Sequence, residues 1–332
     1  MHLHNPTIEQ LKQLDEFVST QPSGNYFQSS SIYHLYSIIP NYSPILLTSQ
    51  DENNNLTGIL LAVVQRETGK IKGRLSSRCV VAGGPLVKDN DLLIAEKLIN
   101  KLIHEVKNKS IYIEFRNLFI GDYFNQIFID NNFKEIEYYN FVVPIVNLEE
   151  NKKKLSASKR RQINKGFKNG ARIIEPEKID HIREFYKILA EMYTTKVKKP
   201  LPPYDFFEKF YKDKATGKYF LVEYKGKIIG GIMCPIFNDT IYEWYECGLD
   251  KEYKDVYPSV LATWAAIEYA ANNELKYFDF MGAGSADEDY GVREFKSKFG
   301  GEQITYKRYI KINNKFLYSI GKAGLKVLSL IK

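Results

Sequence analysis

The sequence is poor in cysteine and histidine. Its three cysteines, Cys79, Cys234 and Cys247, lie far apart and have no C-x-x-C spacing, and its five scattered histidines form no H-x-x-x-H pattern. A disulfide framework needs an even set of cysteines at suitable spacings, and a zinc site needs closely spaced ligand pairs. We therefore expect reduced, buried thiols and no metal site.

Long apolar runs are also missing. No stretch reaches the roughly 18 apolar residues that a membrane-spanning helix requires, and residues 1–13 lack the basic start and apolar run of a secretory signal. Hydrophobic residues make up 44% of the chain and aromatic residues 14%, which is ample material for packed cores. We expect a globular protein that stays in the cytoplasm.

Acidic residues are scarce in the second half. Residues 1–150 carry 13 Lys and Arg against 17 Asp and Glu, whereas residues 151–332 carry 34 against 23. The stretch 151–172 alone holds nine Lys and Arg and no acid. This distribution favours a phosphate-bearing partner, such as coenzyme A, a nucleotide-linked sugar, tRNA or an anionic lipid surface, although basic charge can also simply keep a domain soluble. We expect no DNA partner.

Apolar periodicity predicts one order of elements twice. In each half two helices precede three strands, and a helix, a strand, a helix and a final strand follow. The first set ends with a strand at 139–146, and the second set runs from a helix at 179–193 to a strand at 304–312. This is the order of GNAT acetyltransferase domains. We expect an α/β (α+β) fold of two tandem GNAT domains, 1–150 and 151–332, each a mixed central sheet flanked by helices.

Five motifs occur along the chain in a family-specific order. They are F-Q-S at 27–29, G-G-P at 83–85, S-A-S-K-R-R-Q-I-N-K-G at 156–166, Y-F-D-F-M-G at 277–282 and R-E-F-K-S-K-F-G at 293–300. The third lies in the basic stretch 151–172, which we expect to form a lobe-joining helix. On these motifs the chain resembles the Fem family (FemAB-like) of aminoacyl and peptidyl transferases.

The resemblance implies an acyltransferase that acts on an amine. The leading expectation is transfer of an activated acyl group from aminoacyl-tRNA to an amine of a cell-wall precursor, in peptidoglycan biosynthesis. An alternative is an N-acyltransferase that uses acyl-coenzyme A or an acyl-carrier protein in cell-envelope or polysaccharide biosynthesis. A second alternative is a non-catalytic binding module. We expect no tightly bound cofactor, aminoacyl-tRNA or acyl-coenzyme A as co-substrate, and a phosphorylated or lipid-linked acceptor.

Amine attack on an acyl carbon needs a proton acceptor and a positive group near the developing oxyanion. Lys296 falls on the family's F-K-x-x-F-G lysine and is the expected cation. Glu243 and Glu246 are the candidate bases. They lie in a strand expected over 240–248, where alternation predicts that Glu243 and Tyr245 share one face and that Glu246 lies on the other.

Substrate-binding roles are expected for a mostly basic set of residues in the second half. These are Lys159, Arg160, Arg161, Lys165, Lys196, Lys198, Tyr245, Asp279, Gly282 and Arg293. Lys196 and Lys198 belong to a T-x-x-K stretch where the family carries T-x-x-R, and lysine lacks the bidentate fork of arginine.

Two further departures concern phosphate binding. No basic residue follows F-Q-S between Ser31 and Tyr36, which weakens the case for a UDP-muramyl peptide acceptor. Residues 254–259 lack the glycines of a pyrophosphate loop, and Pro258 removes an N–H donor, which disfavours coenzyme A at the following helix. The tail 313–332 is amphipathic and basic, and we expect it either to pack on the second domain or to contact an anionic membrane peripherally.

Overall fold

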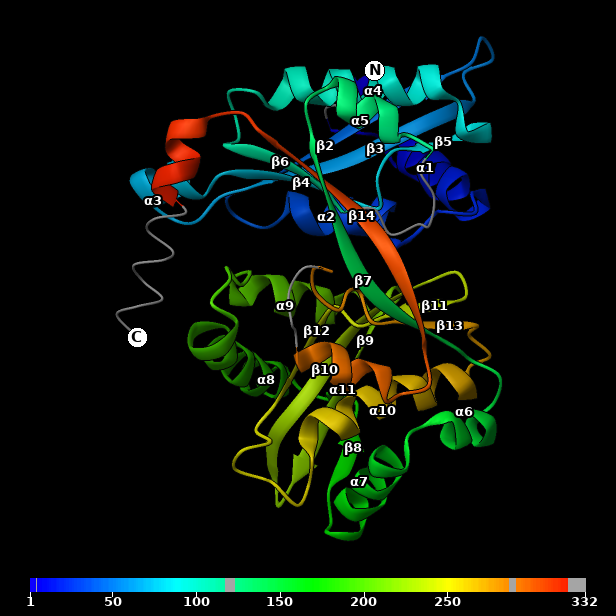
Figure 1. Ribbon diagram of the computed structural model, residues 1–332, viewed down its shortest axis with the longest axis vertical. Helices are drawn as coiled ribbons and strands as arrows, with labels where there is room; N and C mark the ends of the chain where they lie inside the picture. Colours follow the sequence, from blue (N-terminus) through cyan, green and yellow to red (C-terminus); the bar gives the residue numbers. More distant parts are fainter. Residues whose placement is uncertain (4, 117–122, 287–290, 322–332) are drawn as a thin grey trace. The chain divides into compact units, whose positions relative to one another are not determined.

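The computed structural model describes residues 1–3, 5–116, 123–286 and 291–321 (Figure 1). The chain forms two compact units, one of Met1–Tyr138 together with the residues from Thr305 on, and one of Tyr139–Ile304. This division differs from the expected boundary at residue 150. The chain leaves the first unit inside strand β7 (Lys134–Pro144) and returns to it inside strand β14 (Glu302–Ile312).

The first unit is a mixed sheet with helices. Its helices are α1 (Ile8–Thr20), α2 (Ser30–Ser37), α3 (Lys70–Ser76), α4 (Leu92–Val106) and α5 (Asn125–Asp130), and its strands are β1 (His2–Leu3), β2 (Tyr42–Gln50), β3 (Leu56–Gln65), β4 (Arg78–Ala82), β5 (Leu86–Val87) and β6 (Tyr112–Arg116). The strand order is β1-β2-β3-β4-β6-β14, and β4 and β6 are parallel.

The last strand completes the core of this unit. Residues Arg308–Ile312 of β14 pair antiparallel with Arg116–Tyr112 of β6. Tyr309 is buried, and its ring stacks on Phe128 of α5 with 4.0 Å between the ring centroids. Because β14 supplies both backbone pairing and a core side chain, the boundary expected from residue order alone was misplaced.

The F-Q-S and G-G-P motifs meet in the first unit. The Gln28 side chain is fully buried and donates hydrogen bonds to the carbonyl oxygens of Gly83 (3.0 Å) and Gly84 (3.2 Å). Gly83 has a φ of +97°, and a Cβ there would lie 2.6 Å from the Asn25 amide nitrogen. The two motifs therefore form one buried turn, in which glycine meets both a backbone and a space requirement.

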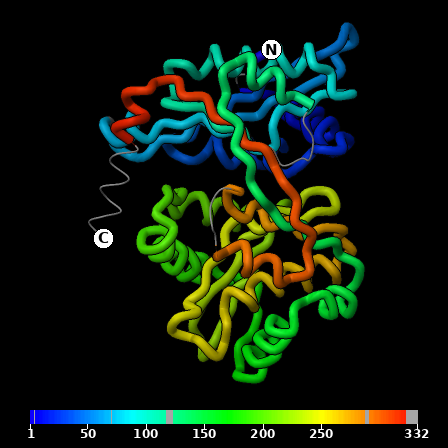
Figure 2. The backbone as a smooth tube through the Cα atoms, viewed as in Figure 1, coloured from blue at the N-terminus to red at the C-terminus, as the bar shows by residue number. Residues whose placement is uncertain are grey.

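The second unit is again a mixed sheet with helices. Its helices are α6 (Leu148–Lys154), α7 (Ala157–Lys168), α8 (Ile179–Met192), α9 (Tyr204–Lys212), α10 (Pro258–Asn272) and α11 (Gly291–Ser297), and its strands besides β7 are β8 (Arg172–Ile174), β9 (Gly217–Tyr224), β10 (Lys227–Phe237), β11 (Thr240–Tyr242), β12 (Tyr245–Gly248) and β13 (Tyr277–Asp279). The strand order is β7-β13-β11-β10-β9-β8, and β12 also pairs with β10. Figure 2 traces the chain of this unit in green, yellow and orange.

Helix α10 lies at the centre of this unit's core. It is apolar around most of its circumference, with Leu261, Trp264 and Ile267 among its buried side chains, and it packs on β9, β10 and β12. Helices that are apolar on all sides are typical of fully buried positions. Pro258 occupies its first turn, as the sequence predicts.

The strand expected over 240–248 is interrupted. Strand β11 ends at Tyr242 and β12 begins at Tyr245. The Glu243 N–H still donates to the Asp279 carbonyl (2.8 Å), but the Trp244 N–H donates to Met233 on the opposite neighbour (3.0 Å). Along β10 the register moves from Ile236 opposite Ile241 to Met233 opposite Tyr245, so four steps along residues 241–245 oppose three steps along β10. This one-residue bulge interrupts the alternation of faces predicted between the two glutamates.

No helix in the described ranges is long and apolar enough to cross a membrane. Of the expected tail 313–332, residues 315–321 form a helix, and residues 322–332 lie outside the described residues. This helix belongs to the first unit, where the Tyr318 ring lies 5.7 Å from the Tyr112 ring, so the expected packing on the second domain is wrong for these residues.

Candidate functional site

Lys296 on α11 is buried and fully hydrogen bonded. Its side chain is only 10% exposed, and its Nζ lies 2.8 Å from Glu243 Oε1. The same Nζ donates to the carbonyl oxygens of Phe280 (2.8 Å) and Gly282 (2.9 Å). An ammonium has three N–H groups. All three therefore have partners, and the predicted catalytic lysine and one predicted base form a buried ion pair.

A polar pair shapes the backbone that Lys296 contacts. Asp279 Oδ1 accepts hydrogen bonds from the Asn140 amide (2.8 Å) and the Met281 N–H (2.6 Å), while Asn140 Oδ1 accepts from the Gly282 N–H (2.6 Å). Met281 and Gly282 both have positive φ. The chain thus turns sharply after β13, which brings the carbonyls of residues 280 and 282 to Lys296. Asp279 and Gly282, expected to bind substrate, build this turn.

Asn140 was missed by the sequence analysis. It is completely buried on β7, in the apolar run Tyr138–Val143. A single polar residue within an apolar strand usually has a specific hydrogen-bond partner in the fold. The sequence therefore indicates that Asn140 has a partner, but it does not identify Asp279, which lies 139 residues further along the chain.

The two glutamates share one electrostatic environment. Burial raises the pKa of Glu243, although Lys296 opposes this, and burial together with the nearby Glu243 and Asp250 carboxylates raises the pKa of Glu246 to about 8. Glu243 Oε2 and Glu246 Oε1 are buried and have no hydrogen-bond partner among the described residues. Alternation predicts the two carboxylates on opposite faces, but the bulge between β11 and β12 interrupts that alternation, and, besides burial, the Glu243 carboxylate raises the pKa of Glu246.

Lys159 points into the same region. It lies on α7, is 5% exposed, and its Nζ lies 3.7 Å from the ring centroid of Phe295 and 4.9 Å from that of Phe299. Burial lowers its pKa to about 8, while Asp250 and Glu246 act in the opposite direction. The first basic residue of the K-R-R motif thus packs on the aromatic residues of the F-K-x-x-F-G motif.

The other cations expected on this helix have separate surroundings. The Arg160 guanidinium donates to the backbone carbonyls of Lys153 (2.8 Å) and Leu155 at the end of α6. Lys165 Nζ lies 2.6 Å from Asp255 Oδ1. Arg161 is exposed. The four basic residues therefore do not form one cationic face: Lys159 is buried, Arg160 and Lys165 contact other parts of the second unit, and Arg161 is exposed.

Arg293 holds the loop that follows β13. Its guanidinium donates to the carbonyl oxygens of Ser285 (2.7 Å) and Ala283 (3.3 Å) and lies over the Tyr139 ring, 4.6 Å from its centroid. It lies one turn before Lys296 on α11, but its contacts are with the loop. These contacts give Arg293 a structural role in the loop. The expected substrate contact stays a prediction.

The T-x-x-K stretch lies in a π-helical turn, Tyr193–Val197, that extends α8. Lys196 and Lys198 are both exposed there. The Tyr193 ring lies 6.2 Å from the Tyr245 ring, which also contacts Phe207 at 5.0 Å. Tyr245 is thus part of an aromatic cluster beside this turn, and π-helical turns are frequent at functional sites.

The sheet opens next to the buried pair. Strand β13 pairs with β11 only as far as Tyr242 and Asp279, and β10 is the one strand of the described chain that pairs with β12. The second edge of β12, which carries Glu246, therefore has no described strand beside it. Backbone groups on such an edge are available to an extended ligand.

The start of α10 is already occupied by a carboxylate. Asp250 accepts hydrogen bonds from the Ser259 N–H (3.2 Å) and the Ser259 hydroxyl. A Cβ at Gly248 would lie 2.5 Å from Ser259 Oγ, so the chain passes very close to this helix end. The N–H groups that could hold a pyrophosphate are thus partly satisfied by Asp250.

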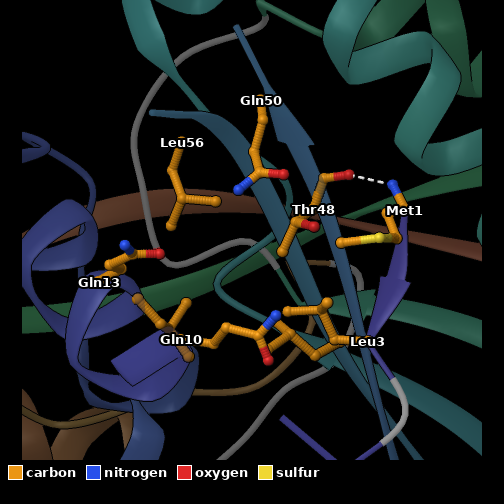
Figure 3. Close-up of a pocket in the computed structure, with 9 residues that line it drawn as sticks. Met1, Leu3, Gln10, Gln13, Thr48, Gln50 and Leu56 are labelled. Atoms are coloured by element: carbon orange, nitrogen blue, oxygen red, sulfur yellow. Dashed lines mark hydrogen bonds between the residues drawn. The ribbon is translucent and has the colours of Figure 1, made fainter. Parts of the chain in front are cut away.

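A small cavity in the first unit is not a substrate site. It is lined by residues that include Met1, Leu3, Gln10, Thr48 and Leu56, and Figure 3 shows the Met1 amino group donating to the Thr48 carbonyl at its edge. Its volume is about 10 Å³, which suffices for one water molecule at most.

Comparisons with known proteins agree with this architecture. Residues 153–297 match the family model described as an acetyltransferase (GNAT) domain. No curated protein matches the sequence at a significant level.

Solved structures resemble the whole chain. A structure of FemX has a TM-score of 0.66 at 14% identity, over 96% of this chain and 99% of its own. L-PGS from Bacillus licheniformis has a TM-score of 0.60 at 13% identity, over 98% of both chains. A tandem GNAT protein from the clavulanic acid biosynthesis pathway has a TM-score of 0.58 at 10% identity, over 95% of this chain and 98% of its own.

At these identities the likeness is one of fold. It confirms the expected tandem GNAT architecture and the resemblance to Fem-type structures. The domain match over 153–297 supports the expected acyltransferase class.

Proposed function

We propose that the second unit transfers an activated aminoacyl group from aminoacyl-tRNA to an amine of a cell-wall precursor. The observation that carries the proposal is the buried Lys296–Glu243 pair, with Glu246 nearby, where strands β12 and β13 separate. A cation and two carboxyl groups in a region shielded from water are the groups that amine attack on an ester requires.

In the proposed reaction the amine nitrogen bonds to the acyl carbon, and the bond from that carbon to the ribose oxygen breaks. The proton of the attacking amine passes to a carboxylate, for which the buried, unpaired Oε1 of Glu246 is the best placed atom. The Glu246 carboxyl group then returns this proton to the ribose oxygen as it leaves, so the carboxylate is restored. Lys296 stabilises the negative charge on the acyl oxygen, which takes the place of one of the two backbone carbonyls that the ammonium now contacts.

The choice of donor rests on the start of α10. In a GNAT domain that binds coenzyme A, free N–H groups there would hold the pyrophosphate. Here Asp250 accepts from Ser259 N–H, and Pro258 has no N–H to offer. A carboxylate at this position also repels a pyrophosphate. Aminoacyl-tRNA has no pyrophosphate that would need free N–H groups at the start of α10.

The choice of acceptor rests on the structural relatives. FemX is a Fem protein, and a second similar structure, at 12% identity and a TM-score of 0.59, is the C-terminal domain of a putative lysylphosphatidylglycerol synthetase from Agrobacterium fabrum. The second name describes a lysyl group placed on phosphatidylglycerol, a membrane lipid without an amine, so it favours an envelope component as the acceptor but not an amine. The choice of an amine-bearing peptidoglycan precursor rests on the resemblance to Fem proteins.

Transfer from acyl-coenzyme A remains the second candidate. The match of residues 153–297 to an acetyltransferase domain favours it. The purified protein should be supplied with labelled aminoacyl-tRNA in one reaction and labelled acetyl-coenzyme A in another, each with peptidoglycan precursors as acceptors. Label transfer from aminoacyl-tRNA and not from acetyl-coenzyme A supports the proposal. Transfer from acetyl-coenzyme A and not from aminoacyl-tRNA would show that coenzyme A carries the donor group. Binding of precursors with no transfer from either donor would identify a non-catalytic binding module.

A further inference from the structure

Helix α3 in the first unit presents apolar and basic side chains to solvent. Ile71 is 77% exposed, and Lys72 and Arg74 are exposed beside it. Gly73 is buried on the inner side of the helix, where a Cβ would lie 2.8 Å from the Glu67 carbonyl oxygen. The helix therefore packs on the first unit through Gly73, and the Ile71 side chain points to solvent, where it contributes little to folding.

The helix at 315–321 has the same character. Phe316 is 73% exposed, and Ile320, one turn later on the same face, is also exposed. Lys315 is exposed beside them. The inner side of this helix carries Tyr318, whose ring lies 5.7 Å from the Tyr112 ring of β6.

The two helices are neighbours within the first unit. A Cβ at Gly321 would lie 3.3 Å from the Leu75 carbonyl oxygen of α3, and Figure 1 shows the red helix beside α3. No Asp or Glu occurs between residues 68 and 88 or after Glu302. Exposed apolar side chains and cations therefore gather on adjacent helices without an acid in either helix.

A groove with a basic lining adjoins α3. It has a volume of about 620 Å³, and its lining residues are Asn41, Arg66, Glu67, Gly69, Gly73, Arg74, Ser77, Asn108 and Lys109. Arg66 is fixed in place because its guanidinium donates to the Lys109 carbonyl (3.0 Å). Lys109 Nζ lies 3.6 Å from a Glu105 oxygen, and Glu67 in the lining offsets part of the charge of Arg66 and Arg74, so the groove keeps a small excess of positive charge.

We propose that α3, the helix at 315–321 and this groove form a surface that docks on an anionic phospholipid bilayer. Apolar side chains would enter the acyl boundary while Lys72, Arg74 and Lys315 lie at the headgroups, and the groove is large enough for a headgroup phosphate. Peripheral helices bind membranes through this combination of buried apolar area and electrostatic attraction.

A bilayer fits these residues better than a nucleic acid does. Isoleucine contributes nothing to base stacking, and Ile71 is the most exposed apolar residue of α3. A bilayer surface, in contrast, uses aliphatic and aromatic side chains equally well. The inference is independent of the proposed catalytic function, because every residue in it belongs to the first unit.

The test is sedimentation of the full-length protein with phosphatidylcholine vesicles, with and without phosphatidylglycerol. Wild-type protein should bind the anionic vesicles and lose binding at high salt. The variant K72Q/R74Q/K315Q should lower the partition constant by about 10-fold or more, because it removes three cations that face the anionic surface. The variant I71S/F316S should lower it by a similar factor, because it removes the most exposed apolar side chain of each helix from the acyl boundary. All these side chains are exposed, so thermal unfolding should not change.

Matched controls come from other faces of the first unit. Ile8→Ser removes an isoleucine that is 89% exposed on α1, and K12Q/K88Q/K97Q removes three exposed lysines. Both should bind vesicles like the wild type. Failure of the wild type to bind anionic vesicles would overturn the proposal, as would equal losses in the control variants. Two other results would replace the bilayer by another partner: tRNA binding that only the surface variants lose, or a wild-type dimer that I71S/F316S converts to a monomer.

Discussion

Lys296 Nζ and Glu243 Oε1 lie 2.8 Å apart in the interior of the second unit, and both side chains are at most 10% exposed. A buried pair of this kind contributes little net stability when intact, because desolvation offsets the attraction. Loss of one partner is different, since it leaves the other charge buried and uncompensated.

Lys296→Met should therefore destabilise the protein by about 3 kcal/mol, the scale for breaking a buried pair. The double variant K296M/E243Q should lose less than the sum of the two single variants, because neither charge remains. Urea unfolding of all four proteins gives the coupling energy. Additive losses would contradict the pairing.

Catalysis gives a second, separate prediction for Lys296. If its ammonium stabilises the acyl oxyanion, turnover of K296M should fall by ~100-fold or more at a temperature where the variant is folded. Lys298→Met is the matched control, because Lys298 also lies near the end of α11 but pairs with exposed Glu294 (2.6 Å). Comparable turnover in the two variants would remove Lys296 from the catalytic groups and leave it a structural role only.

The rate should depend on pH through Glu246. A general base is active as the carboxylate, and burial raises the pKa of Glu246 to about 8, so kcat/KM should increase as pH rises through that value. In Glu246→Gln this limb should disappear and turnover should be low throughout. Because Lys159 also has a pKa of about 8, Lys159→Met serves as the comparison. If K159M loses the limb and E246Q keeps it, the titrating group is the lysine.

Stability should depend on pH in the opposite sense. Between the ordinary pKa of a glutamate and about 8, native Glu246 holds a proton that the unfolded chain has released. Stability therefore falls as pH rises through this window, by up to about 1.4 kcal/mol per pH unit for one proton. Glu246→Gln should flatten this slope and be more stable than the wild type at its alkaline end. An unchanged slope would assign the effect to another group.

The K-R-R motif yields a prediction that separates its members. Arg161→Gln should lower the slope of log K against log salt for tRNA binding by roughly one, because an exposed cation can contact a phosphate. Lys159→Gln should leave this slope unchanged and instead lower the melting temperature, since it places a polar group against Phe295 and Phe299. Filter binding across a salt series, with thermal unfolding alongside, distinguishes the two. Equal slopes for wild type and R161Q would rule out a phosphate contact by this helix.

Much of the fold was accessible from the sequence because its signals are local. Pro258 predicts the start of α10, and the structure has this proline in the first turn of the helix. The F-K-x-x-F-G motif led to Lys296, and the structure adds Glu243, an independent candidate, as its partner.

What the sequence did not reveal depends on contacts between distant residues. Alternation placed Glu243 and Glu246 on opposite faces because nothing in residues 240–248 indicates the one-residue bulge against β10. The basic motif predicted a substrate-binding role for Lys159, whereas the Phe295 and Phe299 rings that cover it lie more than a hundred residues later. The role of Asn140 required its partner Asp279, and the unit boundary required the pairing of β14 with β6.

That pairing has a consequence for synthesis of the protein. When the ribosome has released the first 138 residues, β6 still lacks the neighbour that residues 308–312 later provide. The nascent chain must therefore carry an unsatisfied strand edge, and a cavity where Tyr309 belongs, through more than half of translation. Exposed edges of this kind recruit other strands, so this interval is when the polypeptide is most prone to aggregate and most dependent on chaperones. A chain that stops before Thr305 would retain that exposed edge permanently.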